Sequence, residues 1–477
     1  MARINTNVPA LVAQTNLRRS QRDLQTSLER LASGLRINRG ADDPAGLIVS
    51  ENLRSEIAGV TQAIDNSQRA INVIATAEGA LNEVAALLVD IQDLIVEAAN
   101  KGALSDDEIR ANQLQIDSAI ESITRIANTT TFAGRMLLNG ELDYVTSGVD
   151  ASRIETLQVR GANFGTATFV PVNVNVTVSA QKAELQFRGA VVTNTVTLEV
   201  RGNRGVQTLT IASGTTAAQL VQAVNNVSDS TGVQAELLGT TSGVRFLSEG
   251  YGSKSFVSIE PLGMLSQGSF ATYDADGAAR RRDEGRDVLA MVNGSAATGD
   301  GLGIVLNTSM LDLTLTLAES FGVGSTNFAI TAGGALFQLG PRVDSNQQTS
   351  LGIQSIAASR LGNGAVGFLS EIADGGGKSL IDGQARAASL IVEEAIRQVS
   401  VLRGRLGAFE KNTLQTNINQ LQITRENLTA SESSIRDTDF AAETSRLTRN
   451  QILVNAGTSI LALANSTPQS VLSLLGG

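Results

Sequence analysis

Residues 17–46 read LRRSQRDLQTSLERLASGLRINRGADDPAG. Five leucines in this stretch repeat at intervals of 7, 4, 3 and 4 residues, which is the a/d pattern of a coiled-coil seam. They are Leu17, Leu24, Leu28, Leu31 and Leu35. Glycines and Pro44 then bracket the adjacent Asp42 and Asp43 and interrupt the pattern. The stretch therefore predicts an N-terminal helical arm that is separated from the helix after it.

The same apolar rhythm continues beyond this break. It predicts one long helix from about Gly46 to Asn100, and the S-x-x-E pattern that starts at Ser105 predicts the capped start of a shorter helix. Near the far end, the apolar residues Leu414, Ile418, Leu421, Leu428 and Ile435 are spaced by 4, 3, 7 and 7 residues. Each of these apolar patterns, taken alone, is also typical of the core of a helical bundle. Together they predict that the first and last parts of the chain pair as antiparallel helices.

The middle of the chain has a different texture. From about Leu142 to Asp344, Val and Thr alternate with frequent Gly, as in the segment VNVNVTV that starts at Val172, and this alternation is typical of β-strands. The sequence therefore predicts an α + β multidomain protein. Both chain ends form a long antiparallel coiled-coil helical rod, and the strand-rich outer domain or domains are inserted in the middle.

The composition excludes most catalytic chemistry. The 477 residues include no Cys, His or Trp, which excludes thiol and imidazole nucleophile systems, HExxH sites and Cys/His zinc sites. Gly375 to Ser379 ends like a phosphate-binding loop, but Ile372 stands where that motif needs a glycine. We therefore expect no enzyme activity, no cofactor and no metal site.

Charge and hydropathy exclude other partners. The 37 Lys and Arg against 47 Asp and Glu leave a net charge of −10, without a basic cluster for nucleic acid or an anionic membrane. The apolar stretch from Ile452 to Ala464 is too short to cross a membrane, and the N-terminus lacks the pattern of a cleaved secretory signal.

Several longer motifs occur in a fixed order. Ser33 to Asn38 reads SGLRIN and precedes the Asp-Asp loop, Leu402 to Phe409 reads LRGRLGAF, residues 427–439 read NLTASESSIRDTD, and residues 471–475 read VLSLL. These motifs resemble the terminal regions of bacterial flagellin, the subunit of the flagellar filament. The resemblance implies a structural, self-assembling protein of motility, with no enzyme activity. It implies an extracellular homopolymer, exported by a type III route without a cleaved signal, with the flagellar cap, hook–filament junction proteins and an export chaperone as partners.

The resemblance also implies a division of the chain. Residues 1–44 and 438–477 are the two arms of an inner terminal domain, residues 45–141 and 376–437 form a helical rod domain, and residues 142–375 form the outer domain or domains. A flagellin insert-like module is expected near 188–260, with two strands, a helix over Thr215 to Asn226, and two more strands.

The arms carry the residues expected to mediate assembly. Each isolated arm has a single apolar stripe and buries too little surface by itself, so we expect it to fold against neighbouring copies. The residues expected in this assembly seam are Leu17, Leu24, Leu28, Leu31, Leu35, Leu428, Ile435, Ile452, Ile460, Leu461, Leu472 and Leu475.

One family recognition motif is changed in this chain. Flagellins recognised by the vertebrate Toll-like receptor 5 carry Q-R-V-R-E-L-A-V on the long rod helix. The aligned stretch from Val89 keeps Leu94 but has Asp90 and Gln92 in place of the two arginines, so we expect weak recognition or none. Two alternative functions stay open from the sequence: a hook–filament junction protein, which shares the terminal pattern, and a surface adhesin acting through the outer domain.

Overall fold

The computed structural model describes residues 6–100, 102–165, 167–239, 243–262, 270–308 and 310–475, with side chains described as far as residue 466. The chain forms two compact units. The first contains residues up to 70, residues 338–343 and residues from 411 onward, and the second contains residues 71–337 and 344–410. Both chain ends therefore belong to one unit, as the paired seams predicted.

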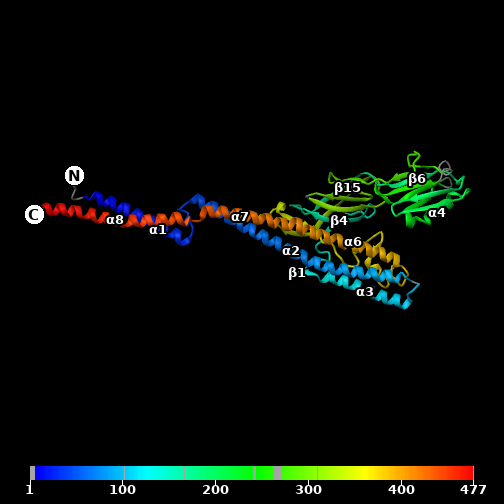
Figure 1. Cartoon of the computed structure of the whole chain (residues 1–477), viewed down its shortest axis with the longest axis horizontal. Coiled ribbons are helices and arrows are strands. Elements are labelled where there is room, and N and C mark those ends of the chain that lie inside the picture. The colour runs from blue at the N-terminus through cyan, green and yellow to red at the C-terminus, as the bar shows by residue number, and fades with distance from the viewer. Residues whose placement is uncertain are drawn as a thin grey trace. The chain divides into compact units, whose positions relative to one another are not determined.

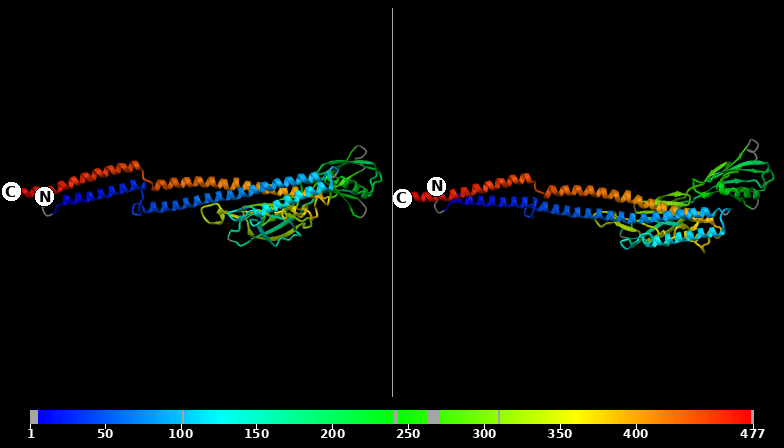
Figure 2. Two further views of the ribbon diagram at one scale, coloured as in Figure 1. Left: turned by 90° about the horizontal axis from the view of Figure 1, so that it is seen from below. Right: turned by 60° about the horizontal axis from the view of Figure 1, so that its bottom comes forward.

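The first unit is helical (Figure 1). α1 (Val8–Ser33) and α8 (Phe440–Leu475) lie side by side, which both views of Figure 2 show, and the first part of α2 (Pro44–Ala98) packs against α7 (Thr416–Arg436). The α2–α7 contact is built on Val60, Ala63 and Leu421, with Ile64 and Leu428 packed around them. A π-helical segment, Glu410–Gln415, precedes α7.

A short segment between the sheets and the last helices also belongs to this unit. The Asn417 side-chain amide donates a hydrogen bond to the Leu339 carbonyl at 2.9 Å. Gly59 on α2 lies so close to Pro341 that an added Cβ would stand 3.1 Å from the proline Cβ. A glycine at this position lets the returning chain lie against the helix backbone.

The long helical segments of the second unit bury regular apolar stripes. They are the rest of α2, α3 (Asp106–Thr129) and α6 (Ala385–Phe409). α3 begins as the sequence predicted, because Ser105 and Glu108 form a reciprocal capping box. The fully or nearly buried apolar residues include Ile74, Leu81, Leu88, Ile91 and Ile95 on α2, Ile116 and Ile123 on α3, and Ile391, Val392, Val399 and Leu402 on α6.

The second unit also contains an eight-stranded antiparallel sheet with the order β3-β18-β5-β14-β15-β16-β17-β4. Alternate residues of β5 face its core, so the VNVNVTV pattern buries valine and exposes asparagine and threonine. Asn293 and Gly294 join β14 to β15 with positive φ at both residues, as a two-residue hairpin turn requires. The strands are β3 (Tyr144–Ser147), β4 (Ile154–Ala162), β5 (Val170–Val178), β14 (Leu289–Val292), β15 (Ser295–Asp300), β16 (Gly303–Asn307), β17 (Leu311–Leu317) and β18 (Gly324–Gly333).

Two four-stranded sheets and a helix form a separate core in this unit. Their orders are β12-β6-β10-β9 and β13-β11-β7-β8, and Leu220 and Val224 of α4 enter the core between them. The predicted order of two strands, a helix and two strands is confirmed. The elements are β6 (Lys182–Phe187), β7 (Val196–Arg201), β8 (Val206–Ile211), α4 (Ala217–Asn225), α5 (Ser228–Thr231), β9 (Val233–Leu237), β10 (Val244–Tyr251), β11 (Phe256–Leu262), β12 (Thr272–Tyr273) and β13 (Arg282–Glu284).

Short elements complete the connections. They are the strand pairs β1 (Thr131–Phe132) with β2 (Arg135–Met136), β19 (Ala335–Gln338) with β20 (Gln348–Leu351), and β21 (Gly362–Asn363) with β22 (Gly367–Phe368), and the 3₁₀ turns Ser345–Gln347 and Leu369–Glu371. The predicted fold class, paired terminal helices with strand-rich middle domains, is confirmed.

Candidate assembly surface

The first terminal helix, α1, has defined ends. The Asn7 side chain accepts a hydrogen bond from the Ala10 amide at 3.1 Å, and Pro9 occupies the first turn, where a missing amide proton costs nothing. Gly34 ends the helix with φ of 74°, a conformation that glycine adopts without strain. Local chemistry therefore limits this helix at both ends.

The two terminal helices meet along one face of each, which we call the arm seam. A Cβ placed on Gly457 would lie 3.3 Å from Leu17 Cδ1, and the Asn7 side chain donates to the Ala464 carbonyl at 2.7 Å. Low residue numbers of α1 therefore meet high numbers of α8, so the helices are antiparallel. The arm seam comprises Ala13, Leu17, Ser20, Leu24, Ser27 and Leu31 of α1 and Glu443, Leu447, Asn450, Val454, Gly457 and Leu461 of α8, none of which is fully exposed.

The end of α1 and the start of α8 lie side by side. Leu35 and Asp437 form an antiparallel β-bridge, the Arg36 amide donates to the Arg436 carbonyl at 2.7 Å, and the Thr438 amide donates to the Gly34 carbonyl at 2.9 Å. These backbone bonds tie the end of α1 to the start of α8.

The adjacent aspartates stabilise the loop that leads into α2. Asp42 Oδ2 accepts from the Asn38 and Arg39 amides at 3.0 and 2.9 Å, and Asp43 Oδ1 accepts from the Gly46 amide at 2.9 Å. The Arg39 amide is the main reason that the pKa of Asp42 is lowered. Asp42 is therefore engaged by backbone amides of its own loop, and Asp43 by an amide in the first turn of α2.

The structure divides the sequence-predicted residues whose side chains it describes into two groups. Leu17, Leu24, Leu31 and Leu461 lie in the arm seam, Leu35 forms the bridge, and Leu428 and Ile435 are half-buried on α7. Leu28, Ile452 and Ile460 lie off the seam and are 50%, 62% and 56% exposed. The side chains of Leu472 and Leu475 lie outside the described part of the structure.

Four further large apolar side chains of the two terminal helices are exposed as well. Together with Leu28, Ile452 and Ile460 they form the outer apolar row, which comprises Leu11, Val12 and Leu28 of α1 and Ile452, Leu453, Ile460 and Leu463 of α8, each 47–67% exposed. So many exposed large apolar side chains on two neighbouring helices favour coverage by a partner. Only Leu28, Ile452 and Ile460 among these seven residues are predicted from the sequence.

Glu443 is a further residue of the arm seam that the sequence did not predict. Its side chain is 4% exposed in the arm seam, 3.9 Å from the Arg30 Nη1 atom and 3.2 Å from that of Arg446. An extension of the heptad row Leu447, Val454 and Leu461 by four residues toward the N-terminus would have placed this carboxylate in the seam.

The receptor-like segment of α2 is only partly accessible. Asp90 is exposed, whereas Gln92 is half-buried and its side-chain amide donates to the Ser389 hydroxyl at 3.0 Å. Leu94 is half-buried. Gln92 is therefore engaged within the chain.

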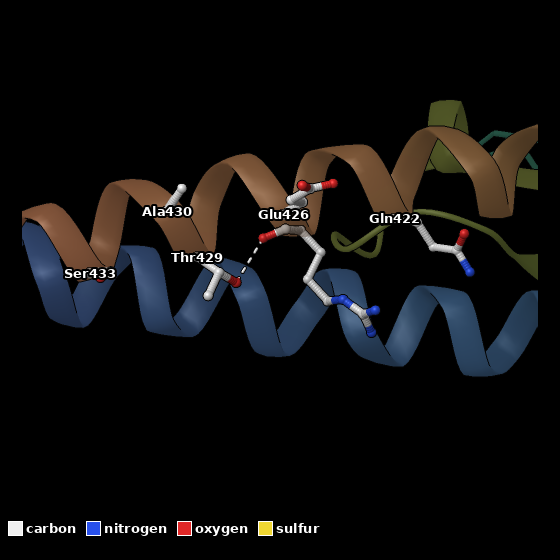
Figure 3. Close-up of a pocket in the computed structure, with 6 residues that line it drawn as sticks. Gln422, Glu426, Thr429, Ala430 and Ser433 are labelled. Atoms are coloured by element: carbon white, nitrogen blue, oxygen red, sulfur yellow. Dashed lines mark hydrogen bonds between the residues drawn. The ribbon is translucent and has the colours of Figure 1, made fainter.

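A shallow surface hollow lies along α7. Its lining comes from this one helix, and Figure 3 shows Gln422, Glu426, Thr429, Ala430 and Ser433 on it, with Arg425 completing the set. The dashed bond in the figure joins the Thr429 hydroxyl to the Arg425 carbonyl within the helix, at 2.8 Å. A hollow that a single helix lines has no opposing wall to enclose a substrate.

The described residues contain neither a metal-binding cluster nor a membrane-spanning helix. No cluster of three or more acidic, His or Cys side chains there is arranged to hold a metal ion. None of the described helices is long and apolar enough to span a membrane.

Three segments of the chain, including both ends, match families of known proteins. Residues 4–143 match the bacterial flagellin N-terminal helical region, residues 390–475 match the bacterial flagellin C-terminal helical region, and residues 197–244 match the flagellin hook IN motif. The chain is 32% identical to the B-type flagellin of Pseudomonas aeruginosa and 30% identical to the flagellin of Salmonella rubislaw. It is also 30% identical to flagellin A of Vibrio cholerae, and each of these alignments covers 99% of both chains.

Proposed function

This chain belongs to the bacterial flagellin family and is a structural subunit of the extracellular flagellar filament, and from that premise we propose that the outer apolar row supplies contacts between its copies. The observation that carries this proposal is the exposure of those side chains in the single chain. Seven large aliphatic side chains on two adjacent helices lose their contact with water when a neighbouring copy covers them.

The arm seam and the outer apolar row have different roles in this proposal. The arm seam joins α1 to α8 within one chain, and its Ser20, Ser27, Asn450 and Gly457 positions bury little apolar surface. Ordering the backbone costs about 1–2 kcal/mol per residue, which such a seam offsets only in part. Contacts through the outer row offset the rest, so the arms fold as the filament grows.

Substitutions of two leucines test the outer apolar row and the arm seam separately. Leu28→Asp places a charge on the exposed outer row, and Leu31→Asp places one in the half-buried arm seam. We expect both variants to stop filament growth, because in the filament each carboxylate would have to leave water without a partner. Gln25→Asp changes an exposed polar site of the same helix and is the matched control, which should polymerise.

The measurement is electron microscopy of filaments grown from purified protein, with circular dichroism to show that the rest of the chain is folded. Normal filaments from Leu28→Asp would show that Leu28 and the outer apolar row make no contact needed for assembly. Normal filaments from Leu31→Asp would show that the arm seam is not needed for assembly.

Finer features of this function rest on the family. We assign the arms to residues 1–44 and 438–477, the rod domain to 45–141 and 376–437, and the outer domains to 142–375. The flagellar cap, the hook–filament junction proteins and an export chaperone would then bind the same arms that bind other copies, since these present the apolar surface that a single chain leaves exposed. We expect Toll-like receptor 5 to recognise the monomer weakly or not at all, because Asp90 presents a negative charge at the receptor-like segment.

A further inference from the structure

The apolar side chains of the arm seam repeat every seven residues on both helices. On α1 they are Leu17, Leu24 and Leu31, and on α8 they are Leu447, Val454 and Leu461. A shift of one helix against the other by seven residues, about 10 Å at 1.5 Å per residue, brings aliphatic side chains opposite aliphatic side chains again. Apolar burial therefore distinguishes poorly between the observed register and its neighbours.

One residue breaks this equivalence. Glu443 belongs to the row that continues with Asn450 and Gly457, and among these three it alone is charged. It is also the most deeply buried of them, and its carboxylate lies 3.9 Å from Arg30 on the opposite helix. Arg446 of its own helix lies 3.2 Å from this carboxylate and moves with it, so the registers differ in the charge that Glu443 meets on the opposite helix.

We propose that the Arg30–Glu443 pair sets the register of the two terminal helices. In the observed register Glu443 faces Arg30. A shift by seven residues would bring it opposite Asp23 in one direction, where two carboxylates repel. In the other direction it would lie past the end of α1 at Ser33, where only Arg446 of its own helix stays beside it. Both shifted registers are therefore penalised at this one position.

The register matters for assembly because it determines which residues of the outer apolar row are neighbours. A shifted pair would keep its own seam and present a different surface to the next copy. A single polar position that selects one register at a cost in stability is an established device in coiled coils. Glu443 is in this sense a positioning residue, which acts through the placement of α8 on α1.

The bridge between Leu35 and Asp437 is the competing explanation, since its backbone bonds also hold the two helices together. The two explanations differ in one respect. If the bridge alone sets the register, replacing Glu443 changes nothing in the alignment of α1 with α8.

Disulfide cross-links between introduced cysteine pairs can report the register, because the chain has no native cysteine. A Cβ placed on Gly457 lies 3.7 Å from the Leu17 Cβ, within the separation that a disulfide requires. Leu17→Cys with Gly457→Cys thus reports the observed register. Leu24→Cys with Gly457→Cys and Ala10→Cys with Gly457→Cys report shifts by seven residues in opposite directions.

The experiment oxidises filaments that carry each pair and separates the chains by non-reducing electrophoresis, where an intrachain loop changes mobility and an interchain bond gives dimers. With Glu443 present we expect intrachain cross-linking of the 17–457 pair alone. With Glu443→Leu we expect cross-linking to spread to the shifted pairs. With Glu443→Arg we expect it to move to the 10–457 pair, since that register places the new cation opposite Asp23 and away from Arg30.

Thr444→Leu adds the same apolar bulk at an exposed neighbouring position and should leave the 17–457 pair as the main product. If a variant does not polymerise alone, it is added as a minority component to growing filaments of the unmodified chain, so that the cross-link can still be read. Exclusive 17–457 cross-linking in both Glu443 variants would overturn the proposal and leave the bridge as the determinant.

Discussion

At the scale of single residues, Asp143 illustrates how burial affects stability. Burial raises the pKa of Asp143, and the positive charges of Arg405 and Arg360 only partly oppose this effect. The folded chain therefore binds the Asp143 proton more tightly than the unfolded chain does. Its contribution to stability is fully present below the ordinary pKa of aspartate and is lost as the pH rises through the raised value.

Asp143→Asn should accordingly raise the urea midpoint of the monomer at pH 7, and the difference should disappear as the pH falls toward 4. Asp150 provides the opposite case, since hydrogen bonds from Ser152 lower its pKa. Asp150→Asn should lower the midpoint at pH 7, with a difference that also fades in acid. A gain at pH 7 that persisted unchanged in acid would show that the charge of Asp143 is not its cause.

At the scale of one element, the capping box of α3 should determine how its first turn opens. Ser105→Ala removes the hydroxyl that bonds the Glu108 amide and should cost about 1 kcal/mol, typical of a lost N-cap. Hydrogen exchange of residues 106–113 should then quicken. Ser118→Ala, at an exposed site within the same helix, is the control and should not quicken exchange there. Equal exchange in both variants would show that tertiary packing holds the turn.

The receptor-like segment of α2 gives a second prediction at this scale. Asp90→Arg with Gln92→Arg should raise the weak response of a Toll-like receptor 5 reporter cell, if charge is the cause of the weakness. The two changes are not equivalent, because Gln92 donates to Ser389 whereas Asp90 is exposed. Asp90→Arg alone tests charge without loss of that bond. A strong response from the unmodified monomer would contradict the expectation.

At the scale of the whole molecule, the terminal arms should be protected only in the polymer. Brief protease treatment of the monomer should remove both ends and leave a core from near Ala45 to near Asp437, because a lone chain gains little by ordering α1 and α8. Filaments should resist the same treatment. Hydrogen exchange checks the cause: strong protection of residues 10–35 in dilute monomer would show that the arms fold alone, and coupled folding and assembly would be abandoned.

The amino-acid sequence by itself determined the helices and several strands, because their signals act between residues close in the chain. The long helix predicted from Gly46 to Asn100 is observed from Pro44 to Ala98, and the Ser105 capping box is present. The helix predicted over Thr215 to Asn226 is α4, Ala217–Asn225. The predicted 414–435 seam spans a π-helical segment and α7, because a heptad pattern does not show a local change in helix type.

Only the tertiary structure decided which side of each helix faces its partner. Leu28 and Leu31 belong to one apolar arc of α1, yet α8 covers Leu31 more than Leu28. Glu443 is of a residue type usually found at the surface, but it is buried, with Arg446 of its own helix and Arg30 from the other end of the chain beside it. Helical periodicity reports an apolar face within one segment. Which part of that face is covered depends on the register with a segment some 400 residues away, and no local pattern contains that information.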